Sequence, residues 1–191
     1  MKALGEIGIK KAIKFGLFTF MMIIYKFMIF PQLRVIFLRL MGARIGGNVV
    51  IHNVGFFNYY RKGFKGLSIG DNSFIGDETM IDLADEIKIK ENVTLAERVV
   101  VLSHTNVGYK DHPLQTFFPS ISKRVVIGMG SFIGVNAVIM PGVSIAEGTF
   151  VAAGSIVTED TKSYSLYVGT PARFIRFIKD GKDEEFSDQQ S

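Results

Sequence analysis

Residues 127–157 read IGMGSFIGVNAVIMPGVSIAEGTFVAAGSIV, with isoleucine or valine at every sixth position from Ile127 to Val157. A second series with the same spacing runs from Ile69 to Val99. Its members are Ile69, Ile75, Ile81, Ile87, Val93 and Val99. An α-helix repeats about every 3.6 residues and a strand about every 2, so neither produces this spacing. The pattern therefore indicates a structural repeat of six residues.

A solenoid of parallel strands with three flat faces explains this period, because each face takes one inward aliphatic residue and small residues fit its corners. Three hexapeptides then form a coil of about 18 residues, and coils stack at the strand spacing of ~4.8 Å. Ile45 and Ile51 share the frame of Ile69, whereas Phe57 and Gly63 fit it poorly. We therefore predict an all-β parallel β-helix over residues 45–170, with an outward bulge at 52–66.

The frame appears broken once, because the spacing from Val99 to Ile127 is not a multiple of six. The break contains VVVLSHTNVGYKDHP (99–113), in which a run of strand-forming residues stops at His104. We predict a loop over residues 103–124 that projects from the otherwise flat wall of the β-helix. Loops on rigid scaffolds commonly carry function.

The basic charge of the chain belongs to its first 44 residues. The whole chain carries a net charge of +4, yet residues 1–44 hold only one acid, Glu6, among many lysines and arginines. The remainder is therefore acidic, which argues against a nucleic-acid partner for the main domain. The chain has no cysteine, which excludes disulfides, thiolate metal sites and a cysteine nucleophile.

Residues 15–30 and 32–42 are apolar and are separated by Pro31. They are too short, and too interrupted by Lys26, for a spanning helix, and no cleavage site for a signal peptide follows them. We predict that residues 1–44 form a helical segment in contact with the inner leaflet of a membrane, which makes the protein cytoplasmic and peripheral. The alternative is that this segment packs on the protein's own body or on a neighbouring subunit.

The hexapeptides from Ile127 to Lys162, followed by GTPARFIR (169–176), resemble the hexapeptide-repeat acyltransferases with a left-handed parallel β-helix. The likeness covers residues 45–178 and is strongest to the maltose, galactoside and polysaccharide O-acetyltransferase branch. It implies a homotrimer with active sites between subunits, acetyl-CoA in the groove between adjacent β-helices, and no metal. Residues 171–191 are expected to form a short helix beginning near Pro171 and an acidic tail.

The resemblance also implies that a loop histidine is the general base, and His104 occupies that place. A neutral imidazole can take the proton of a hydroxyl as the oxygen attacks a thioester. Its second ring nitrogen needs an acceptor that fixes the tautomer, for which Asp111, Glu97 and a backbone carbonyl all remain open. Asp111 and His112 could line the acceptor side, although His112 could also be a solvated loop residue. His52 is read as structural.

The donor side is carried over from the family by position. The backbone N–H of Val135, after Gly134, is expected to face the thioester oxygen, and Phe132 is expected to form an aromatic shelf. Ala153 and Thr158 are expected to border the pantetheine arm. Arg173 and Arg176 are expected to meet the phosphates of CoA, which suits guanidinium geometry.

The acceptor is predicted to be a sugar hydroxyl of a cell-surface polysaccharide precursor or lipid-linked glycan. In the bulge, Phe56, Tyr59 and Tyr60 would stack on sugar faces and Arg61 would meet a phosphate or uronate; alternatively, the bulge covers the open end of the β-helix. The rival reaction is N-acetylation of a nucleotide-linked amino sugar.

A zinc enzyme of the carbonic anhydrase type would need three converging histidines, which the spacing disfavours. A non-enzymatic scaffold would leave His104 and the GTPAR ending without a purpose.

Overall fold

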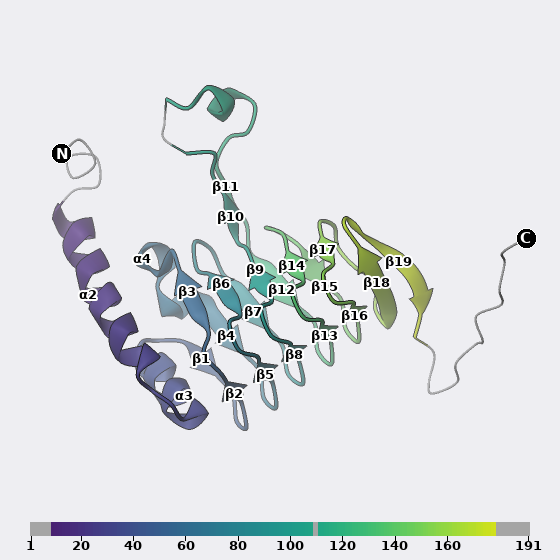
Figure 1. Ribbon diagram of the computed structural model, residues 1–191, viewed down its shortest axis with the longest axis horizontal. Helices are drawn as coiled ribbons and strands as arrows, with labels where there is room; N and C mark the ends of the chain where they lie inside the picture. The colour runs from purple at the N-terminus through teal and green to yellow at the C-terminus, as the bar shows by residue number, and fades with distance from the viewer. Residues whose placement is uncertain (1–8, 109–110, 179–191) are drawn as a thin grey trace, which may run out of the picture.

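The structure, a computed structural model, describes residues 9–108 and 111–178, and it is a three-sided parallel β-helix (Figure 1). We call its sheets A, B and C. Sheet A contains β1 (Arg44–Ile45), β4 (Leu67–Ile69), β7 (Ile87–Ile89), β12 (Val125–Ile127) and β15 (Ser144–Ile145). Sheet B contains β2 (Val50–Ile51), β5 (Phe74–Ile75), β8 (Thr94–Leu95), β13 (Phe132–Ile133), β16 (Phe150–Val151), β18 (Ser165–Gly169) and β19 (Ala172–Phe177). Sheet C contains β3 (Gly55–Phe57), β6 (Met80–Asp82), β9 (Val100–Val101), β14 (Val138–Ile139) and β17 (Ile156–Val157).

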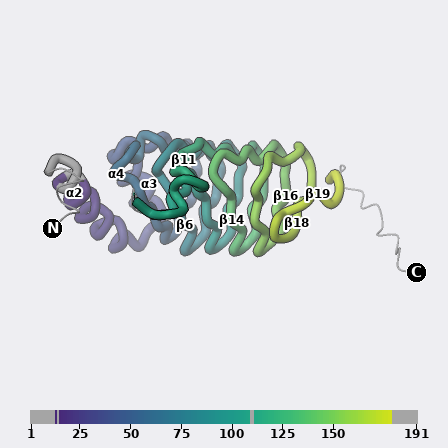
Figure 2. Tube along the Cα trace, turned by 90° about the horizontal axis from the view of Figure 1, so that it is seen from above, coloured from purple at the N-terminus to yellow at the C-terminus, as the bar shows by residue number. Residues whose placement is uncertain are grey.

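The chain runs through A, B and C in turn, and the coils follow one another along the solenoid (Figure 2). This confirms the predicted all-β, left-handed β-helix. Aliphatic side chains of successive coils stack inside, as in the sheet B ladder of Ile51, Ile75, Leu95, Ile133 and Val151, each 0 % exposed. Each buried methylene contributes roughly 0.8 kcal/mol, so these ladders are the main source of stability.

The strand register corrects the predicted frame. Ile69 pairs with Ile89, and Ile81 pairs with Val101, so the second coil holds two residues more than three hexapeptides. The extra residues lie between Ile81 and Ile89, at the corner where sheet C leads into sheet A. The prediction of a single break is therefore wrong: the frame slips once here and again in the 103–124 loop.

The slip is hidden because two positions in each hexapeptide point inward. Ile87, Val93 and Val99 are fully buried, each two residues before the strand position that continues a ladder. In this coil both positions are aliphatic, so an unbroken period of six persists across the insertion.

Two helices cover the N-terminal end of the solenoid: α2 (Ile9–Lys26) and α3 (Pro31–Leu40) (Figure 1). Tyr25 and Leu38 on their inner faces are fully buried, and the Tyr25 ring packs edge-on against Phe56. The predicted helical segment is thus present, and one face of it packs on the body of the protein.

The segment 52–66 does not bulge outward as predicted. β3 continues sheet C by pairing with β6, and α4 (Tyr59–Lys62) and the 3-10 helix η1 (Phe64–Gly66) follow. Phe64 is fully buried and packs against the rings of Phe56 and Tyr59. The alternative is therefore correct, because this segment and the helices together close the open end of the β-helix.

The C-terminal helix predicted near Pro171 is absent from the described residues. Ala172–Phe177 form β19, which pairs antiparallel with β18. Aromatic and β-branched residues in RFIRF favour a strand, and the free edge of β18 offers them backbone hydrogen bonds. The acidic tail, 179–191, lies outside the described residues.

The described parts of the 103–124 loop form an arm that projects away from the solenoid (Figure 1). Its stem is the antiparallel pair β10 (His104–Thr105) and β11 (Ile121–Ser122). Beyond the stem lies the 3-10 helix η2 (Pro113–Thr116).

Candidate active site

His104 is the first residue of β10 in the stem of the arm, at the corner where sheet C would lead into sheet A. Its side chain is 21 % exposed. Its Nδ1 makes a short hydrogen bond with Oδ2 of Asp82, and its backbone N–H donates to the same oxygen at 2.9 Å. Because a carboxylate accepts, Nδ1 carries a proton, and in the neutral imidazole Nε2 therefore keeps its lone pair. Nε2 has no hydrogen-bond partner among the residues that the structure describes.

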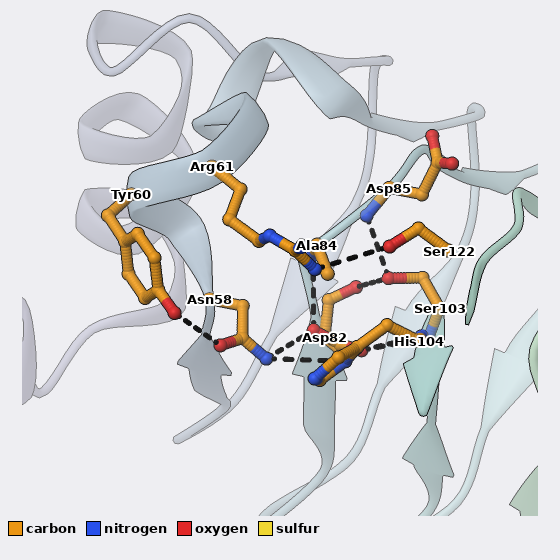
Figure 3. A network of polar contacts seen from close by, with 9 residues as sticks. All are labelled: Asn58, Tyr60, Arg61, Asp82, Ala84, Asp85, Ser103, His104 and Ser122. Atoms are coloured by element: carbon orange, nitrogen blue, oxygen red, sulfur yellow. Dashed lines mark hydrogen bonds and ion pairs between the residues drawn. The ribbon is translucent and has the colours of Figure 1, made fainter. Parts of the chain in front are cut away.

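Asp82 is the centre of this site, and its side chain is fully buried (Figure 3). Its Oδ1 accepts from Nδ2 of Asn58 at 2.8 Å and from the N–H of Ala84 at 3.1 Å. Its Oδ2 accepts from the N–H of Ser103 at 3.0 Å, besides the two donors of His104. Burial acts to raise the pKa of Asp82, but the hydrogen bonds from His104, Asn58 and backbone N–H groups outweigh it and hold that pKa below its ordinary value.

The partner of His104 is therefore none of the candidates left open by the sequence. Glu97 lies between β8 and β9, at the corner of sheets B and C, and Asp111 lies in the arm beyond its stem. The sequence did hold a signal for Asp82. This acid follows the inward Ile81 directly, at the position where the next coil has the apolar Leu102, although the insertion that begins there does not show in the period of six.

Helix α4 holds the other side of this corner. Nη1 of Arg61 donates to Oγ of Ser122 at the root of the arm at 3.2 Å, and Nζ of Lys62 lies 2.9 Å from Oδ1 of Asp85. Tyr60 is partly exposed beside them. Two residues predicted to stack on sugars are unavailable, however. Phe56 and Tyr59 are buried, and Tyr59 stacks on Phe18 and Phe64.

Two arm residues predicted on the acceptor side, Asp111 and His112, are exposed. Nδ1 of His112 accepts from the N–H of Leu114 at 3.2 Å and so caps η2. The stem of the arm separates both residues from His104, so within one chain the structure does not bring them to it.

The residues predicted to meet the acyl donor gather at a different corner. Gly134 and Val135 lie between β13 and β14, and Ala153 lies one coil later between β16 and β17. A Cβ on Gly134 would lie 2.5 Å from the N atom of Ala153, so only glycine allows these turns to stack so closely. The N–H of Gly154 donates to the carbonyl of Val135 at 2.8 Å. The N–H of Val135 has no acceptor in the described part of the chain.

The other residues predicted to contact acetyl-CoA lie farther from this corner. Arg173 and Arg176 are exposed on β19 at the end of the solenoid, and Thr158 follows β17 at the corner of sheets C and A. His104 and Val135 thus lie at opposite edges of sheet C. A single chain therefore does not bring His104, the predicted base, together with the residues predicted to contact acetyl-CoA.

No group of three histidine, cysteine, aspartate or glutamate side chains is arranged to hold a metal ion within residues 9–108 and 111–178.

Comparisons with known proteins give one consistent result. Residues 124–159 match the family model of the bacterial transferase hexapeptide (six repeats). The chain is 32 % identical over 143 residues to the "putative colanic acid biosynthesis acetyltransferase WcaF" of Escherichia coli (strain K12), covering 75 % of this chain and 74 % of that protein. It is 32 % identical over 146 residues to the galactoside O-acetyltransferase of the same strain, covering 73 % and 66 %. A solved galactoside acetyltransferase in complex with coenzyme A superposes with a TM-score of 0.76 at 26 % identity, covering 91 % of this chain and 85 % of that one.

We predict that Asp82 stabilises the fold in a pH-dependent way. Because its pKa is lowered in the folded state, its contribution is present above the unfolded value of about 4 and is lost as pH falls through the folded value. Asp82→Asn should lower the unfolding free energy at pH 7 by about 2 kcal/mol. In urea unfolding, the gap between the two proteins should shrink below pH 4. A gap that stays constant from pH 7 to pH 3 would contradict this assignment.

Proposed function

Since this chain belongs to the hexapeptide-repeat acetyltransferases and uses acetyl-CoA as its acyl donor, we propose that it transfers the acetyl group to a sugar hydroxyl with His104 as the general base. The acceptor is a precursor of a cell-surface polysaccharide or a lipid-linked glycan. The observation that carries this proposal is the His104–Asp82 pair at the root of the arm.

The pair has the properties that a base needs. A sugar hydroxyl is a weak nucleophile until a neighbouring group removes its proton. Asp82 accepts from Nδ1, which leaves the lone pair of Nε2 free to take that proton. The hydroxyl oxygen forms a bond to the thioester carbon, the C–S bond breaks, and the proton on Nε2 passes to the departing thiolate. Asp82 stabilises the imidazolium between these two transfers, because its own low pKa keeps it ionised.

The corner at Val135 fits the acyl donor. Acetyl-CoA supplies an activated acetyl thioester, and its carbonyl oxygen gains negative charge during attack. The unpaired N–H of Val135 can donate to that oxygen. Ala153 and Gly154 present no bulky side chain to the pantetheine arm, and the exposed guanidinium groups of Arg173 and Arg176 suit phosphates.

Base and donor sites meet only if a neighbouring subunit supplies one of them. In a homotrimer with sheet C turned toward the threefold axis, the edge of one subunit that carries His104 lies beside the edge of the next that carries Val135. Sheet A of the first subunit and sheet B of the second then form the walls of the groove between them. The stacked rings of Phe132 and Phe150 on sheet B, with centroids 4.8 Å apart, would line one wall.

The outward side chains of the sheets support this arrangement. Those of sheet C form an apolar ladder of Met80, Val100, Val138 and Ile156. Those of sheet A form a mostly polar ladder of Arg44, Ser68, Lys88, Val126 and Ser144. A row of apolar residues on a flat sheet is suited to burial between subunits, whereas sheet A is suited to water. The outward ladder of sheet B, from Phe74 to Leu166, is also largely apolar, so the positions of His104 and Val135 on the two edges of sheet C are what favour sheet C over sheet B.

The acceptor class is supported by the printed names of the relatives, one a colanic acid acetyltransferase and the other a galactoside O-acetyltransferase. In this chain Arg61 is exposed at the root of the arm, within hydrogen-bonding reach of Ser122. It could meet a phosphate or uronate of the acceptor. Asp111 and His112 could reach an acceptor bound to a neighbouring subunit, because the arm extends away from its own solenoid.

The N-terminal helices are proposed to dock on the inner leaflet of an anionic membrane. Apolar residues are strongly exposed on these helices and in the turn that joins them, among them Phe27 at 79 % and Ile29 at 80 % in the turn and Leu40 at 82 % at the end of α3. No acidic residue occurs between Glu6 and Asp71. An apolar face with only basic neighbours suits an anionic lipid surface. Within residues 9–108 and 111–178, the helices lack the length and hydropathy needed to cross a bilayer.

His104→Ala should lower kcat for acetyl transfer by about 10²–10⁴-fold, because the hydroxyl loses its base. The assay follows CoA release with acetyl-CoA and a panel of free, lipid-linked and amino sugars. His52→Ala is the matched control, since Nδ1 of His52 also lies 3.3 Å from an aspartate, Asp77, at an exposed corner. Equal activity in the two variants would remove His104 from the reaction, and transfer confined to amino sugars would establish N-acetylation instead.

Val138→Lys should dissociate the trimer, because it places a charge in the middle of the sheet C ladder. Val126→Lys makes the same change on the polar face of sheet A and should leave the trimer intact. Light scattering coupled to gel filtration reports the mass, and CoA release should fall with it for Val138→Lys alone. Dissociation by both variants, or by neither, would rule out sheet C as the interface.

Phe27→Glu together with Ile29→Glu should reduce co-sedimentation with vesicles of anionic phospholipid by at least about tenfold, since two exposed apolar anchors become charged. Ile175→Glu, an exposed apolar residue at the other end of the solenoid, should leave sedimentation unchanged. Binding that is equally strong to neutral vesicles, or equally weakened in both variants, would count against this docking surface.

A further inference from the structure

We propose that Asn58 and Tyr60 are positioning residues that hold the Asp82 carboxylate in the orientation that His104 requires. This inference rests on the proposed role of His104 as the base. Neither residue is one that the sequence pattern assigns to catalysis, because both lie in the segment that closes the end of the solenoid.

Asn58 reaches the His104–Asp82 pair, which we call the dyad, from the side opposite the arm (Figure 3). Its Nδ2 donates to Oδ1 of Asp82 at 2.8 Å and lies 3.4 Å from Nδ1 of His104. It is the only side chain among the described residues that donates to Oδ1, because the other donor to that oxygen is the N–H of Ala84. Asn58 therefore limits rotation of the carboxylate, and the His104 ring follows the carboxylate that it contacts.

The backbone of Asn58 is adapted to this task. Its φ is 54°, in the left-handed region that asparagine tolerates better than most residues. This conformation stands at the start of α4 and turns the chain from β3 into that helix. Asn58 thus joins the sheet that carries Asp82 to the helix that covers it.

Tyr60 fixes the amide of Asn58. Its hydroxyl donates to Oδ1 of Asn58 at 3.2 Å, which leaves the NH₂ group facing Asp82. A flipped amide would bring its oxygen against the carboxylate and lose the bond to Asp82, so the carboxylate selects the amide orientation and the Tyr60 hydroxyl restrains the side chain in it. The ring of Tyr60 meets Phe15 of α2 edge-on, with centroids 6.0 Å apart. The N-terminal helix thereby supports the hydroxyl that orients Asn58.

The test compares Asn58→Gly with Asn48→Gly. Glycine keeps the positive φ at both sites, so only the amide is lost. Asn48 is a matched control, because its φ is 52° and its Nδ2 donates to Oδ1 of Asn72 at 3.0 Å, remote from the dyad. Asn58→Gly should lower kcat about tenfold to a hundredfold with little change in KM for acetyl-CoA, since a small displacement of a catalytic group is that costly. Asn48→Gly should leave kcat unchanged, with a similar unfolding midpoint.

Tyr60→Phe keeps the ring and removes the hydroxyl. Alone it should lower kcat severalfold, and on the Asn58→Gly background it should have no further effect, because Tyr60 acts through Asn58. Additive losses would mean that Tyr60 acts elsewhere. Equal kcat for the two glycine variants would reduce Asn58 to a structural residue.

A second measurement needs no acceptor. The Nδ1 proton of His104, assigned with His104→Ala among the three histidines, should give a downfield NMR signal that weakens or moves in Asn58→Gly but not in Asn48→Gly. An unchanged signal would overturn the positioning role. If instead His104→Ala keeps full activity, the base assignment fails, while the NMR result still decides whether Asn58 holds the pair.

Discussion

The buried carboxylate of Asp82 is the constraint on which the site depends. A charge without water is costly unless hydrogen bonds replace its hydration. Here the donors are Asn58 before α4, Ala84 at the corner after β6, and Ser103 and His104 at the start of the arm. Each of these segments must therefore be in place for the charge to be tolerated. The imidazole of His104 is one of these donors, so its position is tied to that of the surrounding backbone.

The same corner explains why the coil is irregular. A regular hexapeptide coil would pass directly from Asp82 into sheet A, with no room for a carboxylate to accept from neighbouring backbone. The two extra residues of the second coil provide this room, and Ala84 in that insertion donates to Asp82. Ser103, at the start of the arm, holds this insertion at two points, because its hydroxyl donates to the carbonyl of Asp82 and accepts from the N–H of Asp85. The insertion and the arm thus form one structure built over two coils.

The sequence predicted the β-helix, and it placed His104 at the start of a projecting segment, because both features depend on local patterns. Stacked aliphatic side chains require the period of six, and a histidine that interrupts it is conspicuous. The slip at Asp82 could not be seen, since Ile87 and Ile89 both point inward and either one satisfies the pattern. Asp82 was missed for the same reason: its contact with His104 depends on a coil whose length the pattern conceals. Phe56 and Tyr59 looked like an exposed platform because the sequence does not reveal that α2 covers them. The residues after Pro171 form a strand and not the predicted helix, because the edge of β18 is free to pair with them.

The covering of one solenoid end by α2 and α3 has a consequence for avidity. A trimer built around sheet C has its threefold axis along the solenoid, so all three helical caps face the same side. In the proposed trimer, three such caps would engage one surface together, and once the first is bound the others would meet it at high effective concentration. A contact too weak to retain a single chain would then retain the assembly, with every active site at a fixed height above that surface.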